Sequence, residues 1–171
     1  MLYIRGKLLF IHIPRTGGTS ITSSLARHYL AEDPRLGITM GTGNLLPFHH
    51  HATAKEMRPY IPDWQEIHKF AVFRSTDDII ASDYRLHLRE SSEGAFKPTP
   101  EWEESLRLSE GETLAEFTRR RWNGWIGQRG AWDYWTESWP DIVRYDFRSL
   151  GHEWGRLCEV LGIEAELIRC N

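Results

Sequence analysis

Three short apolar runs divide the chain into strand-like segments, and longer stretches with helical periodicity separate them. The runs cover residues 8–13, 68–73 and 141–145. The first run is nearly continuous, which is the pattern of a strand buried on both faces of a parallel sheet, and the other two are further candidate strands. Strands that alternate with helices give a sheet covered on both sides. The pattern therefore predicts an α/β fold with three layers, α/β/α, around a central parallel sheet.

The intervening stretches predict the helices. After the first run, Ile21, Leu25 and Tyr29 recur at helical spacing from a start near Gly18. Ser75 is a suitable N-cap for a helix over 77–88, since Asp78 follows it three residues later as in a capping box. Further helices are expected over 52–58, 113–122 and 152–161, the last with Gly162 at its C-cap.

The length and composition favour one domain over residues 1–171. A chain of 171 residues that is 40% hydrophobic can bury one sizeable core and has little room for a second. Residues 89–112 change character, because they are rich in Glu, Ser, Gly and Pro. We expect an exposed insert or lid there, with a short helix that starts at Pro100 and is capped by Thr99.

The net charge and the cysteines indicate which kinds of partner and which cellular compartment the sequence favours. A net charge of −3 argues against nucleic acid as the main partner. Cys158 and Cys170 lie in no metal-type spacing and make no disulfide framework, which fits a reducing compartment. No signal peptide and no apolar run of membrane-spanning length is visible. We therefore expect a cytoplasmic protein without an integral membrane segment, and the oligomeric state stays open.

A phosphate-binding loop is predicted between the first strand and the first helix. Two glycines allow backbone N–H groups to approach an anion, and the helix N-terminus adds unpaired donors and partial positive charge. A Walker A loop needs a Lys before its hydroxyl residue, whereas here Gly18 is followed directly by Thr19. The alternative is a tight turn without a ligand. The candidate binding residues are Arg15, Thr16, Gly17, Gly18, Thr19 and Ser20.

A second anion contact is predicted where the next strand ends. Arg74 follows this strand, and Ser82 stands 82 − 74 = 8 positions later, about one and a half turns into the following helix. A guanidinium and a hydroxyl can then converge on one anion. The alternative is that Arg74 pairs with Asp77 or Asp78 and that Ser82 has no role.

Three adjacent histidines are candidates for a general base. A histidine can take a proton from a hydroxyl at neutral pH, and His51 is our first choice, ahead of His50 and His49. A solvated loop and a weak metal site are the alternatives. If the cluster is inert, Asp83 or Glu32 is the fallback base. His12, in the first apolar run, is expected to be a core histidine.

These motifs resemble the sulfotransferase family, in particular its carbohydrate-sulfotransferase branch. The segment 10–20 resembles the loop that holds the 5'-phosphosulfate of the donor PAPS (3'-phosphoadenosine 5'-phosphosulfate), with Arg15 in place of the usual Lys. The segment 73–84 resembles the motif in which an Arg and a Ser eight residues later hold the 3'-phosphate. The segment 51–54 resembles one that carries a proposed catalytic His.

The resemblance implies a P-loop NTPase-like fold and a transferase that uses PAPS as co-substrate and needs no metal. His51 and Arg15 would be its catalytic residues. The acceptor would be a hydroxyl of a glycan, a lipid or a small molecule. The family's late basic loop has no counterpart here, and Arg119–Arg121 or Arg129 are expected substitutes. An ATP-dependent small-molecule kinase and a non-catalytic nucleotide-binding domain are the alternatives.

Five tryptophans crowd one region and are expected mainly in the core, although some can line a pocket. They are Trp122, Trp125, Trp132, Trp135 and Trp139. The run Arg119–Arg121 is expected to form a solvated helix face.

Overall fold

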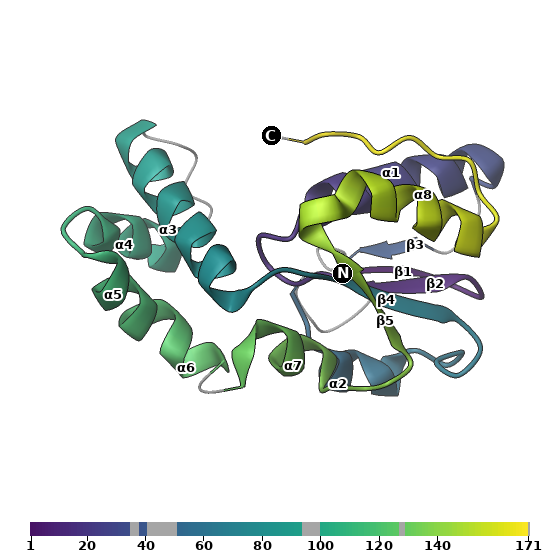
Figure 1. Ribbon diagram of the computed structural model, residues 1–171, viewed down its shortest axis with the longest axis horizontal. Coiled ribbons are helices and arrows are strands. Elements are labelled where there is room, and N and C mark those ends of the chain that lie inside the picture. Colours follow the sequence, from purple (N-terminus) through teal and green to yellow (C-terminus); the bar gives the residue numbers. More distant parts are fainter. Residues whose placement is uncertain (35–37, 41–50, 94–99, 127–128, 171) are drawn as a thin grey trace. The chain divides into compact units, whose positions relative to one another are not determined.

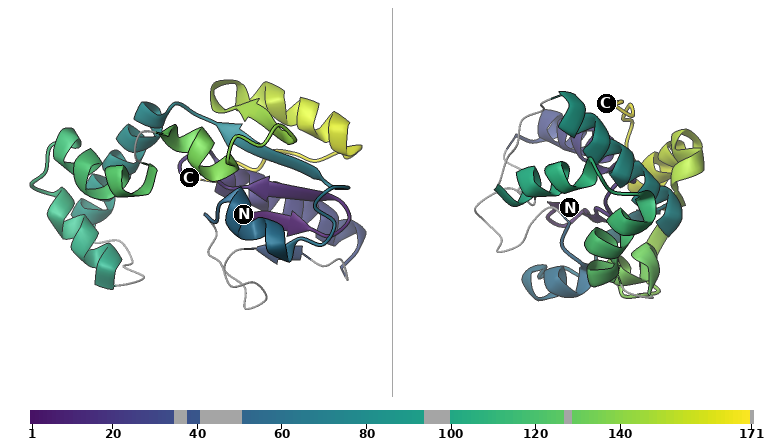
Figure 2. Two further views of the ribbon diagram at one scale, coloured as in Figure 1. Left: turned by 90° about the horizontal axis from the view of Figure 1, so that it is seen from below. Right: turned by 90° about the vertical axis from the view of Figure 1, so that its left-hand side faces the viewer.

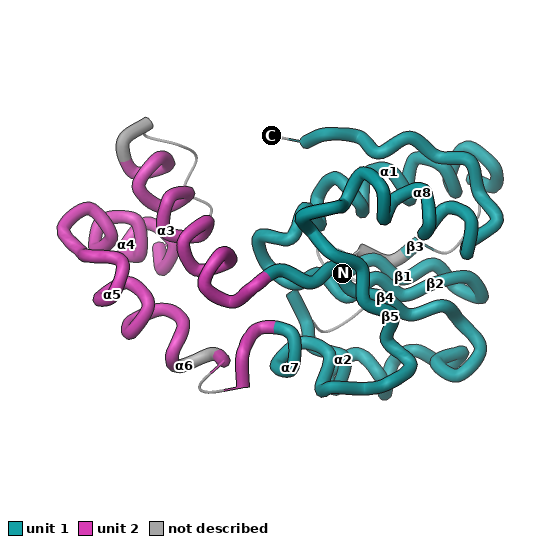
Figure 3. Tube along the Cα trace, viewed as in Figure 1, with its two compact units in different colours: residues 1–74, 132–171 teal, residues 75–131 magenta. Residues whose placement is uncertain are grey.

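The computed structural model describes residues 1–34, 38–40, 51–93, 100–126 and 129–170. The chain forms two compact units (Figure 3). Unit 1 contains residues 1–74 and 132–171, and unit 2 contains residues 75–131. The insert expected over 89–112 lies within unit 2.

Unit 1 is built on a five-stranded sheet with the strand order β3-β1-β2-β4-β5. Strands β2, β4 and β5 are parallel, as the three apolar runs predict, whereas β1 runs antiparallel to both β2 and β3. The expectation of a wholly parallel sheet is thus wrong. The strands are β1 (Leu2–Ile4), β2 (Leu8–Ile11), β3 (Ile38–Met40), β4 (His68–Phe73) and β5 (Ile142–Asp146).

A tight turn between β1 and β2 explains the antiparallel edge. Gly6 has φ 69°, and Lys7 N–H donates to the Ile4 carbonyl at 3.0 Å. Asp63 fixes this turn by accepting the Gly6 N–H at 2.5 Å and the Tyr3 hydroxyl. So short a connection can only reverse the chain direction.

Helices cover both faces of the sheet in unit 1. Helices α1 (Gly18–Glu32) and α8 (Leu150–Leu161) lie on one face, and α2 (Ala54–Met57) and α7 (Gly130–Thr136) lie on the other (Figure 1, Figure 2). Two single turns, η1 (Arg58–Tyr60) and η3 (Phe147–Ser149), complete the connections. The expected α/β fold with three layers is therefore found, around a mixed sheet.

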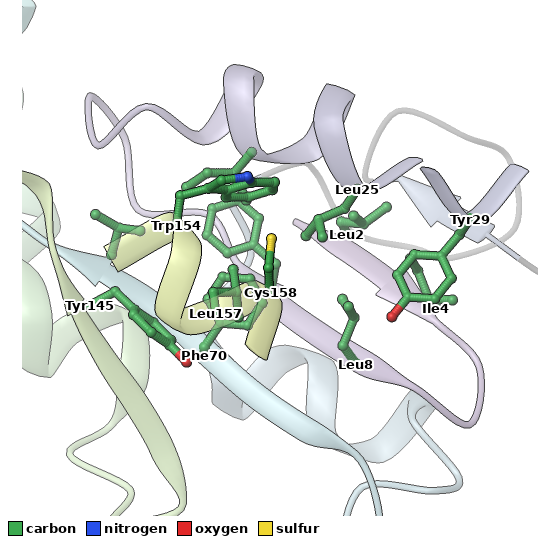
Figure 4. Packing of buried hydrophobic residues seen from close by; sticks show 13 residues of the cluster. Leu2, Ile4, Leu8, Leu25, Tyr29, Phe70, Tyr145, Trp154, Leu157 and Cys158 are labelled. Carbon is green, nitrogen blue, oxygen red and sulfur yellow. The ribbon is translucent and has the colours of Figure 1, made fainter. Parts of the chain in front are cut away.

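The core beneath α1 and α8 joins side chains from all three apolar runs (Figure 4). Burying each such side chain is worth about 1.5–3 kcal/mol before the cost of ordering the chain. The buried residues are Leu2, Ile4, Leu8, Phe10, Ile21, Leu25, Tyr29, Phe70, Val72, Tyr145, Trp154, Leu157 and Cys158. This packing fixes the carboxyl ends of β2 and β4 beside the start of α1.

Local signals set the ends of the helices, and those at Ser75 and Gly162 are the ones that the sequence predicts. Thr53 and Glu56 form a capping box at the start of α2, and Gly162, in the left-handed conformation, ends α8. In unit 2, Ser75 Oγ accepts the Asp78 N–H at 3.2 Å at the start of the next helix. These caps satisfy helix-end donors and carbonyls that otherwise lack partners.

Unit 2 is helical. Its elements are α3 (Thr76–Glu93), α4 (Pro100–Ser109), α5 (Leu114–Phe117), the π-helical turn η2 (Thr118–Trp122) and α6 (Asn123–Ile126). Most residues of α4 are exposed, and its apolar side, with Leu106, packs against α3. Thr99, the expected cap of α4, lies outside the described residues. None of the described helices is long and apolar enough to cross a bilayer.

Candidate phosphate-binding and proton-transfer site

The loop between β2 and α1 makes a sharp turn at the carboxyl end of β2. Arg15 and Gly17 both adopt left-handed conformations, with φ 61° and 77°. For Arg15 this conformation is strained, whereas Gly17 adopts it without steric cost. Gly17 is the N-cap of α1. Because glycine has no side chain, the first N–H groups of the helix have no side-chain cap. Because the first turn of α1 contains no acidic residue, the helix start keeps its full attraction for an anion.

Gly18 is required because the His12 ring lies against it. A Cβ at position 18 would lie 1.8 Å from both Cδ2 and Nε2 of His12. The apolar run predicts that His12 is a core residue, but strand β2 ends one residue earlier and His12 is only half-buried. Its imidazole therefore stands at the start of the helix.

The hydroxyl residues of the loop differ in their burial and in their hydrogen bonds. Thr16 is fully buried, and its Oγ1 donates to the Ile13 carbonyl at 2.7 Å, so this side chain braces the loop from inside. Thr19 is exposed. Ser20 Oγ accepts the Cys170 N–H at 3.0 Å. Ser20 thus anchors the C-terminal segment, and Thr19 is the hydroxyl of the loop that faces solvent.

The segment 163–170 runs back along α1 (Figure 1). Ile168 N–H donates to Ser24 Oγ at 2.8 Å, one helical turn beyond the Ser20 contact. Trp154 Nε1 donates to the Ala165 carbonyl at 2.7 Å and holds the segment to α8. The segment therefore lies beside the start of α1, although the sequence contains no signal for it.

Arg74 joins the second motif to the loop. It follows β4, and its Nη1 donates to the Arg15 carbonyl at 2.7 Å. Its guanidinium carbon lies 4.5 Å from the centre of the Phe147 ring, and the Phe147 ring also packs beside Gly17. Arg74 is thereby held at the carboxyl ends of β2 and β4, where ligands of such sheets bind.

Ser82 lies on α3 in unit 2, together with Asp77 and Asp78. The convergence of Ser82 with Arg74 on one anion stays a prediction. The alternative ion pair of Arg74 with one of these aspartates stays a prediction as well.

His51 is bonded in a way that fixes its tautomer. Its Nδ1 lies 2.8 Å from the His12 carbonyl oxygen. Since a carbonyl can only accept, Nδ1 must carry the proton. In the neutral ring, Nε2 then holds the lone pair and can accept a proton. Trp135 Nε1 donates to the His51 carbonyl at 2.8 Å and fixes the backbone there. His49 and His50 lie outside the described residues.

The fallback base Asp83 already has two partners. It is 4% exposed, and its Oδ2 accepts from Arg121 Nε at 2.8 Å and from Trp122 Nε1 at 3.0 Å. Arg120 is paired with Glu112. Arg119 and Arg120 are exposed, as expected of a solvated face, and Arg121 is half-buried. Arg120 and Arg121 also cross-link unit 2 through their ion pairs. The other fallback base, Glu32, lies 3.3 Å from His28 Nε2.

The tryptophans follow the expectation where the structure describes their side chains. Trp122 and Trp135 are each 1% exposed and belong to the core. Trp132 is half-buried and packs edge-to-face on Phe73 at 6.1 Å, while the Arg144 guanidinium lies over that Phe73 ring at 3.3 Å.

A hollow on unit 2 and the arrangement of metal-ligating side chains bear on other kinds of binding site. Unit 2 carries a shallow hollow of about 420 Å³ along α4, lined by Glu104, Leu108 and Arg120 among others. The residues of the phosphate loop do not line it. Within the described part of the chain, no group of three or more His, Cys, Asp or Glu side chains is arranged to hold a metal.

Comparison with known proteins found no family model, no curated protein and no solved structure that matches this chain.

Proposed function

We propose that this chain is a PAPS-dependent sulfotransferase with a P-loop-like α/β fold. It would transfer a sulfuryl group from PAPS to a hydroxyl of a glycan, lipid or small-molecule acceptor. The observation that carries the proposal is that Arg74 and His51 both bond to backbone carbonyls of the segment that leads into α1, within unit 1. The guanidinium of Arg74 and a histidine with a defined tautomer thus lie beside a helix start that has no side-chain cap.

The cations and the start of α1 would bind the phosphates of the donor PAPS. Arg15 and the first N–H groups of α1 would stabilise the charge that grows on the departing 5'-phosphate. Arg74 would bind the 3'-phosphate, and this phosphate distinguishes PAPS from ATP. Binding of the 3'-phosphate would compete with the bond from Arg74 to the Arg15 carbonyl, so ligand binding would change how the loop is held.

His51 suits the acceptor. Its Nε2 would accept the proton of the acceptor hydroxyl, whose oxygen attacks sulfur as the bond from sulfur to the 5'-phosphate oxygen breaks. The reaction then depends on positioning and electrostatics, as in phosphoryl transfer. No step in this scheme requires a metal.

The proposed setting is the cytoplasm, with no nucleic-acid partner. Cys158 and Cys170 are both free thiols, and this supports a reducing compartment.

The test is transfer of labelled sulfate from PAPS to a panel of hydroxyl compounds. His51→Ala should lower the transfer rate by about 10²–10⁴-fold, the usual worth of a general base. His152→Ala is the matched control, because His152 is an exposed histidine on α8 of the same unit. If no acceptor is labelled although the protein binds PAP (3',5'-adenosine bisphosphate), the enzyme assignment is wrong and the chain is a nucleotide-binding domain.

A further inference from the structure

We infer that His12 is a second functional histidine of this site, and that it takes up a proton when an anion binds at the start of α1. The inference rests on the proposed function, since it concerns the same loop. No motif in the sequence assigns this role to His12.

The contacts of His12 place its imidazole at the loop. The ring lies against Gly18, the first residue of α1, so closely that no side chain fits there. It stacks on Phe10 at 5.7 Å between ring centres and meets the His51 ring edge-to-face at 4.5 Å. The edge that faces Gly18 includes Nε2, the nitrogen nearest to the uncapped helix start. His12 as a whole is half-buried.

Positive charge borders the segment that carries His12. The start of α1 has a partial positive charge, and Arg74, from the end of β4, is held at the Arg15 carbonyl. The titratable His51 ring meets the His12 ring edge-to-face. Positive charge at the helix start disfavours a cation on His12, and a bound anion would offset it. Anion binding should therefore raise the pKa of His12.

This proton has a use in the proposed reaction. Arg15 stands where the family has Lys, and a guanidinium cannot release its proton in a protein. His12, protonated when the donor binds, can give its proton to the 5'-phosphate oxygen as the bond from that oxygen to sulfur breaks. His51 meanwhile gains the proton of the acceptor hydroxyl. In the reaction His51 gains one proton and His12 loses one. Proton exchange with solvent then returns each histidine to its starting protonation state.

The experiment measures binding of inorganic sulfate between about pH 5.5 and 8.5 by calorimetry. Sulfate does not titrate in this range, so any pH dependence belongs to the protein. For the wild type, the affinity for sulfate should fall as pH rises. Between the pKa values of His12 in the free and bound states, the fall should be up to about tenfold per pH unit. In His12→Gln this dependence should disappear, whereas His152→Gln, at an exposed histidine of α8, should keep it.

A second measurement covers the case in which His12→Gln does not fold. NMR titration of the His12 ring in the wild type should give a higher pKa in sulfate than in chloride. An unchanged pKa, or a pH dependence that persists in His12→Gln, overturns the inference. If sulfate binds with the expected proton linkage but PAP does not bind, the inference holds and the PAPS assignment fails. If neither binds, both are wrong.

Discussion

Arg74 Nη1 donates a hydrogen bond to the backbone carbonyl of Arg15, with 2.7 Å between the two atoms. This bond joins the carboxyl end of β4 to the turn that precedes α1, across 59 residues of sequence. It holds Arg15 by its backbone in a left-handed conformation that a residue with a side chain rarely adopts. Arg15 and Arg74, one from each sequence motif, are therefore joined within unit 1.

Replacing Arg74 should abolish the preference of the protein for a 3'-phosphate. Arg74→Met removes a charged hydrogen-bond donor worth about 1.5–3 kcal/mol, so the affinity for PAP should fall by about ten- to a hundredfold and approach that for ADP. Arg27→Met, at an exposed arginine of α1, is the charge-matched control and should bind PAP like the wild type. Calorimetry with both nucleotides provides the comparison. Equal losses in the two variants would point to net charge alone.

Adding a methyl group at Gly18 should disrupt the site, because the new Cβ would fall 1.8 Å from the His12 ring. Gly18→Ala must displace His12, and PAP binding should fall at least tenfold. Gly155→Ala is the control, since a Cβ there meets nothing within 4 Å. As Gly155 lies within α8, alanine there should stabilise the protein by about 0.5–1 kcal/mol. Binding and thermal unfolding of both variants check the prediction, and intact PAP binding in Gly18→Ala would refute it.

The stability of unit 2 should depend on Asp83. Its buried carboxylate holds Arg121 and Trp122, and breaking a buried pair costs about 3–5 kcal/mol. Asp83→Ala should therefore speed hydrogen exchange of the α3 amides strongly. Glu104→Gln breaks the exposed pair with Arg107, and it should leave exchange almost unchanged. Similar exchange in the two variants would show that the Asp83 network contributes little.

Acid should destabilise both units through buried histidines. Burial lowers the pKa of His87 in unit 2, where the ring is fully buried between Trp102 and Phe117. Burial and the nearby Lys69 lower the pKa of His68 in unit 1. A lowered folded pKa means that the unfolded chain binds more protons, so stability falls as pH drops below the ordinary histidine value of about 6.5.

Urea unfolding at a series of pH values checks this prediction. The His87→Phe variant should lose part of the acid dependence, because phenylalanine fills the apolar space without titrating. A pH profile identical to that of the wild type would mean that His87 does not contribute.

The sequence predicts the parallel part of the fold well because the signals there are local. Strand β4 has the predicted bounds, and Ser75, Thr53 and Gly162 act through neighbours a few residues away. Strand β1 is not predictable in this way. Its turn depends on Asp63, 57 residues from the Gly6 amide that it fixes.

The candidate site is likewise predictable from the sequence only where its signals are local. The glycines and arginines of the loop are recognisable because their backbone and charge requirements are local. The place of His12 is not, since it depends on the missing side chain of Gly18 and on His51, 39 residues away. The contact of Ser20 with Cys170 spans 150 residues, and no spacing in the sequence indicates it.

The central claim, that the site holds a nucleotide with a 3'-phosphate, is tested most directly by comparing the affinities of the protein for PAP and for ADP. The two ligands share adenine and ribose and differ in where the phosphates stand. Our account predicts that PAP binds at least tenfold more tightly, because Arg74 would give the 3'-phosphate a charged hydrogen bond. Equal binding, or tighter binding of ADP, would contradict it.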